Sequence, residues 1–240
     1  MAVKSNDDCM ATGVAVELGD LPQLGGDASR TYRLGLMGGT FDPIHHGHLV
    51  AAEAAYEMLG LDVVVFMPAG IPAFKQNKRV SSGKDRYAMT LLATSDNPHF
   101  RASRFEVDYD GVTYTAETLS RLRQVYPQNV EFYFITGADA IAEVTTWRDA
   151  GTIAKLAHLV GATRPGYDLS CAQSAFAASP YSFDVTYLEV PALAISSSYL
   201  RERVGKRESL RYLTPDSVMG YVHKYHLYGA GADQLDEKER

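Results

Sequence analysis

Short apolar runs alternate with longer segments of helical period through most of this chain. The apolar runs, rich in β-branched and aromatic residues, predict strands at 32–37, 62–67, 99–105, 130–136, 158–163 and 185–190. Apolar positions at helical spacing predict helices at 46–59, 85–95, 115–126, 197–204 and 215–225. Because strands that alternate with helices are typical of parallel βαβ units, we expect a single α/β domain built on an open, doubly wound parallel sheet.

Two of the predicted strands have apolar side chains at almost every position. The segments 62–67 (DVVVFM) and 130–136 (VEFYFIT) lack the strict alternation of a strand with one solvated face. Both are therefore expected to lie inside the sheet, with helices covering both faces. In such sheets ligands bind outside the carboxyl ends of the strands, so the loops that follow strands are where a functional site is expected.

The two ends of the chain lack this pattern. Residues 1–30 mix Gly, Asp, Ser and Asn without a sustained period, and residues 229–240 (GAGADQLDEKER) follow the last predicted helix. We expect a flexible N-terminal extension over 1–30, a folded domain over 31–228 and a flexible C-terminal tail over 229–240.

Composition narrows the class of protein. Of the 240 residues, 46% are hydrophobic and 22% charged, as in ordinary soluble globular proteins. The 23 basic and 29 acidic residues leave a net charge of −6, so we expect no nucleic-acid partner. The chain has neither an apolar run of about 18 residues nor a secretory signal, which argues against a membrane partner. The 2 cysteines form neither a disulfide framework nor a zinc pattern, so a cytoplasmic location is expected. A homo-oligomer is compatible with the sequence, which does not specify the oligomeric state.

The most distinctive segment, Gly38–His48, follows the first predicted strand and reads GGTFDPIHHGH. It lacks the GxxxxGK[ST] of a P-loop and the GxGxxG of a dinucleotide site. Two adjacent glycines let backbone N–H groups approach an anion, and the start of the next helix adds free amides and a partial positive pole. His45 and His48 are three residues apart, so they face the same side of that helix start. Their imidazole N–H groups are suited to stabilise charge on a phosphoryl group during its transfer.

Two other interpretations of this segment stay open when its residues are taken one by one. The histidines could serve only as helix-start residues, with Asp42 accepting backbone hydrogen bonds and Pro43 shaping the turn. Asp42, His45 and His48 could instead bind a metal ion, although no second cluster of His, Cys or carboxylate residues completes a coordination shell. The eleven-residue string as a whole favours the phosphate interpretation over both.

The string GGTFDPIHHGHL closely resembles the signature of the HxGH nucleotidyltransferase superfamily and, within it, of the bacterial nicotinate-nucleotide adenylyltransferases. The resemblance extends over about residues 32–225 and implies a Rossmann-like nucleotidyltransferase fold for the domain. It implies that His45 and His48 contact the phosphates of the bound nucleotides, while His46 occupies the variable position. It also places the preceding loop residues at the phosphates of ATP: Gly38, Gly39, Thr40 and Phe41.

A second matching element lies far downstream. Residues 195–201 (ISSSYLR) look like the ISSTxIR segment of the family. Serines before a helix supply an N-cap and hydroxyl donors, the helix start supplies amides, and an arginine one turn later supplies a forked cation. The leaving pyrophosphate is therefore assigned to Arg201. The remaining ATP contacts are assigned to Ile195, Ser196, Ser197 and Ser198.

Middle segments of the chain resemble the family's acceptor-binding and nucleotide-binding elements. Thr115 lies in GVTYTAETL, which is similar to the GxSYTxDTL stretch of nicotinate-nucleotide enzymes with Glu117 in place of Asp. The resemblance implies that Thr115 caps a helix near the pyridine ring. It also implies that Asp139, in GAD, lies at the ATP site and that Trp147 stacks on the nicotinate ring. Arg164, in an RPG turn, is assigned to nicotinate mononucleotide.

The loop after the second predicted strand departs from the family pattern. The family often has PPHK there, whereas this chain has Pro72, Ala73, Phe74 and Lys75. Lys75 is assigned to the phosphates of ATP, with a solvated loop lysine as the alternative. The sequence does not reveal the effect of Phe74 in place of histidine.

The resemblance implies transfer of AMP from ATP to the 5′-phosphate of nicotinate mononucleotide, giving deamido-NAD and pyrophosphate in NAD biosynthesis. A phosphate oxygen is already a nucleophile at neutral pH, so we expect direct in-line displacement without a covalent intermediate. Mg²⁺ is expected to enter with ATP, bridging its oxygens, without protein ligands. The rival acceptors are phosphopantetheine and nicotinamide mononucleotide, and a non-catalytic nucleotide sensor is the rival of another class. A preference between nicotinate and nicotinamide leaves no mark in the sequence.

Overall fold

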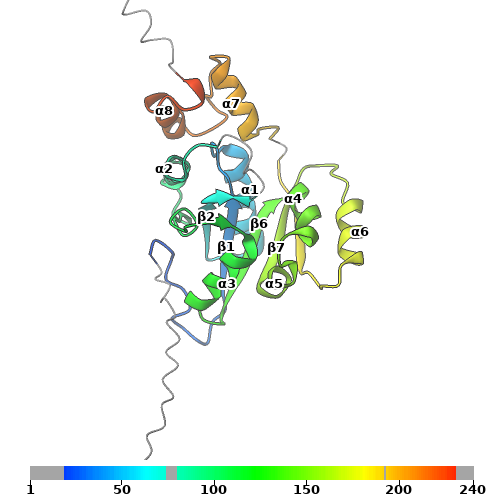
Figure 1. The fold of residues 1–240 in the computed structure, drawn as a ribbon. Coiled ribbons are helices and arrows are strands. Elements are labelled where there is room, and N and C mark those ends of the chain that lie inside the picture. The colour runs from blue at the N-terminus through cyan, green and yellow to red at the C-terminus, as the bar shows by residue number, and fades with distance from the viewer. Residues whose placement is uncertain (1–18, 74–79, 192, 231–240) are drawn as a thin grey trace, which may run out of the picture.

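The computed structural model describes residues 19–73, 80–191 and 193–230, and its centre is a six-stranded sheet (Figure 1). The strand order is β4-β2-β1-β6-β7-β8, and every neighbouring pair is parallel. The strands are β1 (Tyr32–Gly39), β2 (Val63–Pro68), β4 (Phe100–Ala102), β6 (Val130–Gly137), β7 (Ala157–Thr163) and β8 (Val185–Glu189). The chain reverses its direction of winding between β1 and β6, which is the switch point of a doubly wound sheet. The predicted fold class is therefore confirmed.

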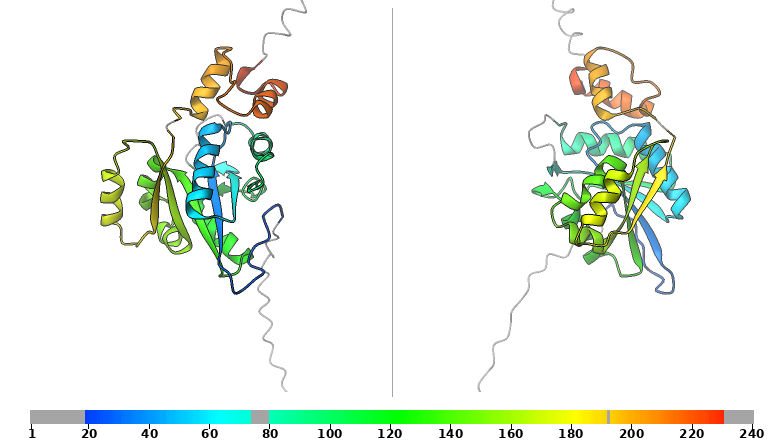
Figure 2. Two further views of the ribbon diagram at one scale, coloured as in Figure 1. Left: turned by 180° about the vertical axis from the view of Figure 1, so that it is seen from behind. Right: turned by 90° about the vertical axis from the view of Figure 1, so that its right-hand side faces the viewer.

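Helices cover both faces of this sheet (Figures 1 and 2). They are α1 (His46–Leu59), α2 (Gly83–Thr94), α3 (Thr115–Val125), α4 (Ala138–Glu143), α5 (Ala150–Leu156), α6 (Ser170–Ala178), α7 (Ser197–Gly205) and α8 (Asp216–Lys224). A first core cluster joins apolar side chains of α1, α2, α7 and α8 to the sheet, and a second joins those of α3, α4 and α5. None of the helices in the described ranges is long and apolar enough to cross a membrane.

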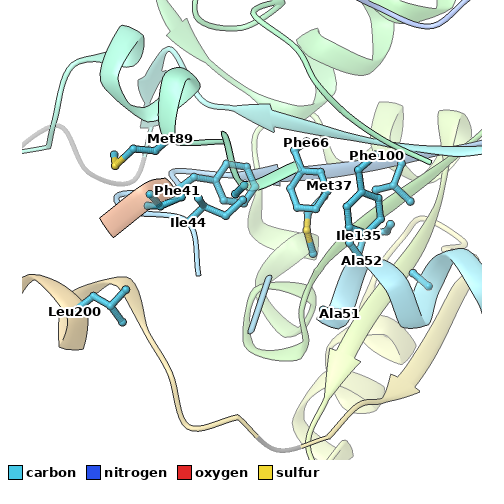
Figure 3. Close-up of a cluster of buried hydrophobic side chains, with 14 of the residues drawn as sticks. Met37, Phe41, Ile44, Ala51, Ala52, Phe66, Met89, Phe100, Ile135 and Leu200 are labelled. Carbon is cyan, nitrogen blue, oxygen red and sulfur yellow. The ribbon is translucent and has the colours of Figure 1, made fainter. Parts of the chain in front are cut away.

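Strand β2 explains the continuous apolar runs in the sequence. Val64 and Phe66 enter the first core cluster, where Figure 3 shows Phe66 beside Phe100. The alternate side chains enter the second cluster: Val63, Val65 and Met67. Successive side chains of a strand point to opposite faces, so a strand that is covered on both faces is apolar throughout.

The predicted strands and helices are all present, with ends shifted by at most three residues. The predicted helix 46–59 coincides with α1, which ends where Gly60 adopts a left-handed conformation (φ 58°) and donates its N–H to Tyr56 O. The elements that were not predicted are short: the paired strands β3 (Ile71–Pro72) and β5 (Val112–Thr113), the helices α4, α5 and α6, and the 3₁₀ turns η2 (Val144–Thr146) and η3 (Leu227–Gly229). Helices of 6 and 7 residues, such as α4 and α5, are too short to show a period.

The N-terminal boundary differs from the prediction. Part of the expected flexible extension, residues 19–30, packs against the domain. Leu21 is 5% exposed, and the Pro22 carbonyl accepts a hydrogen bond from the Tyr126 hydroxyl (2.7 Å). These contacts come from single side chains and backbone atoms in a segment without regular structure, so no periodic pattern signals them. Residues 1–18 lie outside the described part of the chain.

The C-terminal boundary also moves by two residues. Gly229 ends η3, and Ala230 is 5% exposed, so both belong to the fold rather than to the expected tail over 229–240. The remainder of that tail, 231–240, lies outside the described residues.

Candidate active site

The loop from Gly38 to Ile44 leaves the carboxyl end of β1 and is anchored in the first core cluster. Phe41 is 2% exposed and Ile44 is fully buried, and Figure 3 shows both side chains within that cluster. A Cβ atom on Gly39 would lie 2.8 Å from the Phe41 ring, and one on Gly38 would lie 2.9 Å from the Phe134 ring. The two glycines therefore let the backbone approach both rings closely, which fits a loop whose N–H groups face a ligand.

Both candidate catalytic histidines lie at the start of α1. The rings of His45 and His48 stack, with centroids 3.7 Å apart and planes inclined by 26°. His48 Nδ1 accepts a hydrogen bond from the backbone N–H of His45 (3.2 Å). Accepting this bond requires a lone pair on Nδ1, so the ring proton is on Nε2. His48 therefore presents an N–H donor in a fixed orientation.

His45 is the N-cap residue of α1 and is 6% exposed. Burial, with a smaller contribution from the neighbouring His46, lowers the pKa of His45 to about 4. At neutral pH the ring is uncharged, so it offers one N–H donor rather than a positive charge. A Cβ atom at Gly47 would lie 3.0 Å from His45 Nδ1, so this glycine leaves room beside the ring. The helix-start interpretation describes the position of His45 correctly, but it does not account for the stacked pair.

Asp42 is turned away from the histidines. Its carboxylate is 2% exposed and accepts hydrogen bonds from the Tyr228 hydroxyl (2.6 Å) and the Ser81 N–H (3.3 Å). These bonds occupy the group that a metal site with His45 and His48 would need. Within the described ranges, no group of three or more His, Cys, Asp or Glu residues is placed to hold a metal ion.

The downstream serine and arginine segment contacts the loop after β1 directly. Ser196 caps α7 by accepting a hydrogen bond from the Tyr199 N–H (3.2 Å). Ser197 Oγ donates to Pro43 O (2.8 Å), which joins two residues that are 154 positions apart. The predicted meeting of these two distant segments is therefore observed.

Arg201 holds the same loop from the second turn of α7. Its Nη1 donates to Asp42 O (2.7 Å), and its Nη2 donates to Ser198 Oγ (3.1 Å). With Asp42 and Tyr228, Arg201 lines a cavity of about 790 Å³ that is separate from the cavity lined by the histidines. The structure thus places Arg201 against the backbone of the loop and not beside the imidazoles.

Two cavities open at the carboxyl ends of the central strands. The histidine cavity, of about 200 Å³, is lined by His45, His48, Asp139, Arg164, Tyr167 and Ile195 among others. The tryptophan cavity, of about 440 Å³, is lined among others by Gly38, Gly39, Thr40, Thr115, Trp147 and Arg148. Thr136, near the end of β6, lines both of them. The two cavities therefore meet at the switch point between β1 and β6, where this class of sheet binds ligands.

The histidine cavity contains one residue that the sequence assigns to the other substrate. Arg164, assigned to nicotinate mononucleotide, follows β7 and lies in the histidine cavity together with Asp139, which was assigned to ATP. Asp139 lies in the first turn of α4 and accepts a hydrogen bond from the Tyr167 hydroxyl (2.7 Å). The carboxyl end of β7 lies on the side of the switch point where the histidine cavity opens, so Arg164 and Asp139 line the same cavity.

The tryptophan cavity contains the remaining predicted acceptor residues. Thr115 is the first residue of α3, but Tyr114 and not Thr115 occupies the N-cap position. Trp147 is half-buried, and its ring packs edge-on against Phe134 at a centroid distance of 6.2 Å. Lys75 lies outside the described residues, so its predicted role stays a prediction.

Sequence reasoning missed some residues that the fold brings to these cavities. Thr136 and Tyr167 had no motif-based role, although Thr136 ends a strand that was predicted to be interior and Tyr167 follows the RPG turn. Arg148 directly follows Trp147 and belongs to no motif of its own. Glu106 had no signal in the sequence, because it reaches the tryptophan cavity from an irregular segment after β4.

Glu106 has the only carboxyl group among the described residues that line the tryptophan cavity. Its Oε1 accepts a hydrogen bond from the Thr118 hydroxyl (2.6 Å). Burial raises the pKa of Glu106 from 4.5 to about 7, despite opposing hydrogen bonds from Thr118 and Thr113 and the charges of Arg121 and Arg86. Near neutral pH, about half of the folded molecules therefore carry a neutral carboxyl at this position.

This pKa predicts a pH-dependent effect of Glu106→Gln on stability. Between pH 4.5 and about 7 the folded chain keeps the Glu106 proton while the unfolded chain has lost it, so ionisation opposes folding as pH rises. Relative to that of the parent protein, the free energy of unfolding of the variant should rise by up to about 3 kcal/mol as the pH is raised from 4.5 to 8. Urea unfolding of both proteins across this range measures the difference. A difference that does not change with pH would contradict the expectation.

The sequence of this chain is similar to those of known proteins. Residues 36–203 match the family model described as cytidylyltransferase-like. The chain is 53% identical over 192 residues to the probable nicotinate-nucleotide adenylyltransferase of Frankia casuarinae, covering 80% of this chain and 98% of the relative. It is also 53% identical over 196 residues to the protein of the same name from Frankia alni, covering 82% and 100%.

A solved structure shares the fold at low sequence identity. Nicotinic acid mononucleotide adenylyltransferase of Plasmodium falciparum, complexed with NaAD, aligns with a TM-score of 0.68 and 19% identity over 84% of this chain and 99% of that chain. With the relatives at 53% identity, the resemblance inferred from the sequence is confirmed. The chain belongs to the cytidylyltransferase-like family and, within it, to the nicotinate-nucleotide adenylyltransferases.

Proposed function

We propose that this protein transfers AMP from ATP to the 5′-phosphate of nicotinate mononucleotide, giving deamido-NAD and pyrophosphate. The observation that supports this best is the pair of cavities that meet at Thr136, one containing stacked imidazoles and the other a tryptophan. A transfer between two bound nucleotides requires adjacent sites with a shared border. The names of the relatives agree with this reaction.

Each cavity suits one substrate. We place the phosphates of ATP in the histidine cavity, near the start of α1 and the cation of Arg164; at about 200 Å³ this cavity holds part of the nucleotide and not the whole. Nicotinate mononucleotide occupies the tryptophan cavity, whose volume of about 440 Å³ suits a small ligand. Gly38, Gly39 and Thr40, which the sequence assigns to the phosphates of ATP, line this cavity and not the histidine cavity. We therefore place them around the transferring phosphoryl group, between the acceptor phosphate and ATP.

The chemistry is an in-line displacement at the α-phosphorus of ATP. An oxygen of the acceptor phosphate forms a bond to this phosphorus as the bond to the β-phosphate oxygen breaks, and pyrophosphate leaves with the electron pair. His45 and His48 act as neutral N–H donors to the transferring phosphoryl group, so neither has to lose a proton first. No nucleophilic side chain is required.

The remaining proposed contacts are with the phosphates of ATP and with the leaving pyrophosphate. Ile195 lines the histidine cavity, and Ser196 and the amides at the start of α7 follow it directly in the chain. Arg201 binds Asp42 O and Ser198 Oγ and lines a cavity separate from the histidine cavity, so its proposed contact with the leaving pyrophosphate uses its remaining N–H donors and requires pyrophosphate to leave toward that cavity. Mg²⁺ arrives as part of the MgATP substrate and neutralises phosphate charge through ATP oxygens.

A comparison of acceptors tests the proposal. Pyrophosphate release from MgATP is measured with nicotinate mononucleotide, nicotinamide mononucleotide and phosphopantetheine side by side. We expect release with nicotinate mononucleotide and none with phosphopantetheine. Release with phosphopantetheine alone would overturn the acceptor assignment. If the protein binds ATP but releases no pyrophosphate with any of the three acceptors, the result would instead support a nucleotide sensor.

A further inference from the structure

Arg148 lines the tryptophan cavity and directly follows Trp147 in the chain. Its guanidinium carbon lies 4.5 Å from the centroid of the Tyr114 ring, and its Nη2 lies 3.4 Å from Glu117 Oε1. Both partners belong to the start of α3, so two contacts fix the direction of this side chain. The side chain is nevertheless 61% exposed, which leaves the guanidinium accessible to a ligand.

The direction in which the acceptor lies in this cavity follows from the reaction, so this step rests on the proposed function. The acceptor phosphate has to reach the border with the ATP site, where Gly38, Gly39 and Thr136 lie. The pyridine ring therefore lies away from this border, among residues that line the tryptophan cavity but not the histidine cavity, which include Trp147 and Arg148. Any charged substituent on the ring is brought close to the guanidinium of Arg148.

The charged residues that line the tryptophan cavity favour an anionic substituent on the pyridine ring. Among the described residues that line the tryptophan cavity, Arg148 is the only cation and Glu106 is the only acid. Glu106 is held on α3 by the hydrogen bond from Thr118, and burial raises the pKa of this carboxyl to about 7, which weakens its repulsion of a second anion. Arg148 is therefore the charged group that distinguishes a carboxylate from a neutral amide.

The contacts of Arg148 allow a substrate carboxylate to take the place of Glu117 beside the guanidinium. An exposed ion pair such as Arg148 with Glu117 contributes little to stability, because solvent screens both charges. A substrate carboxylate can therefore replace or join Glu117 at little cost and gain charge-assisted hydrogen bonds from the planar guanidinium. A carboxamide has one neutral oxygen acceptor and gains no ionic attraction.

We propose that Arg148, oriented by Tyr114 and Glu117, is a specificity-determining residue that favours a pyridine mononucleotide whose ring carries a carboxylate over one whose ring carries a carboxamide. Arg148 contacts a part of the substrate that does not react. Its contribution is therefore to binding, so removal of the guanidinium raises KM without changing the rate of the chemical step.

The test compares Arg148→Gln with Arg121→Gln. Arg121 also lies over aromatic rings, 4.2 Å from the Phe105 centroid and 4.6 Å from the Tyr109 centroid, but it is not among the described residues that line the tryptophan cavity. The two variants lose the same charge on neighbouring surfaces, so only a direct contact distinguishes them. For each protein, kcat and KM are measured with nicotinate and nicotinamide mononucleotides at saturating MgATP.

For Arg148→Gln we expect the preference for the nicotinate substrate, as a ratio of kcat/KM values, to fall about tenfold or more. The loss should lie in KM for that substrate, and Arg121→Gln should keep the parent ratio. Because Trp147 is the only tryptophan, quenching of its fluorescence gives the dissociation constants of both mononucleotides independently of turnover. The constant for the nicotinate substrate should rise by the same factor as KM.

Two failures are distinguishable. If the parent protein binds neither mononucleotide and releases no pyrophosphate, the proposed function is wrong. If the parent protein is active and Arg148→Gln keeps the parent ratio, or if Arg121→Gln lowers the ratio equally, only the role of Arg148 is overturned. Circular dichroism of both variants shows whether a lost preference reflects misfolding, and Arg148→Lys, which keeps the charge but not the fork, should retain an intermediate preference.

Discussion

Replacement of His48 by alanine should lower kcat for AMP transfer about a hundredfold, which corresponds to the loss of one preorganised donor worth about 3 kcal/mol in the transition state. The hydrogen bond from His45 N–H to His48 Nδ1 fixes the ring and leaves Nε2–H as the donor. The stacking distance of 3.7 Å to His45 further restricts the ring. A donor held in this way stabilises charge that develops on the transferring phosphoryl group. Steady-state pyrophosphate release at saturating substrates measures the effect.

His46→Ala provides the matched control. His46 lies between the two candidate catalytic histidines in the sequence, but it does not line the histidine cavity as described. This variant should keep kcat within about twofold of the parent, because it removes an imidazole without removing a donor from the site. Full activity in His48→Ala, or equal losses in the two variants, would contradict the role given to His48.

The helices and strands that could be predicted from the sequence are those whose burial is periodic. Helix α1 has buried alanines at positions 51, 52 and 55 and ends at Gly60, so spacing and stop signal agreed with its observed ends. Strand β2 is buried at every position and left an unbroken apolar run. The N-terminal segment around Leu21 could not be predicted, because it packs through isolated contacts that no local pattern records.

The candidate site also has parts that could be predicted from the sequence and parts that could not. The meeting of the first loop with Ser197 and Arg201 could be expected, because both segments carry motifs with phosphate-binding chemistry. The cavity in which Arg164 lies could not be predicted, because it depends on which side of the switch point β7 ends. The groups that hold Asp42 have no motif either: the hydroxyl of Tyr228 comes from 186 positions away.

The loop after β1 is therefore held by parts of the chain that carry no phosphate-binding motif. Tyr228 and Ser81 bind the Asp42 carboxylate, and burial next to Asp42 raises the pKa of the Tyr228 hydroxyl well above its usual value, so it remains a donor at all moderate pH values. Arg201 binds the carbonyl of the same residue. Arg86 adds three hydrogen bonds to backbone carbonyls, one of them on Thr40 of this loop.

Replacement of Arg86 by methionine should destabilise the folded protein by about 3 kcal/mol or more, because it leaves buried carbonyl groups without donors and a buried carboxylate without its facing charge. Arg86 is 1% exposed, and its Nε, Nη1 and Nη2 donate to Ser81 O (3.0 Å), Thr40 O (2.9 Å) and Gly70 O (2.7 Å). Burial lowers the pKa of the guanidinium, and the charge of Asp42 opposes this shift. Urea unfolding measures the change in the free energy of unfolding.

The control removes an arginine that makes an ion pair on the surface. Arg104 pairs with Asp108, with side chains 42% and 58% exposed, so Arg104→Met should leave the urea midpoint almost unchanged. If Arg86→Met does not fold, Arg86→Lys keeps a charge but cannot span the three carbonyls on Thr40, Gly70 and Ser81, and it should still unfold at lower urea than the parent. An Arg86 variant as stable as the parent would mean that the loop keeps its shape without this side chain. The glycine bend and the histidine pair would then be held by the contacts of Asp42 and Pro43 and by the buried Phe41 and Ile44.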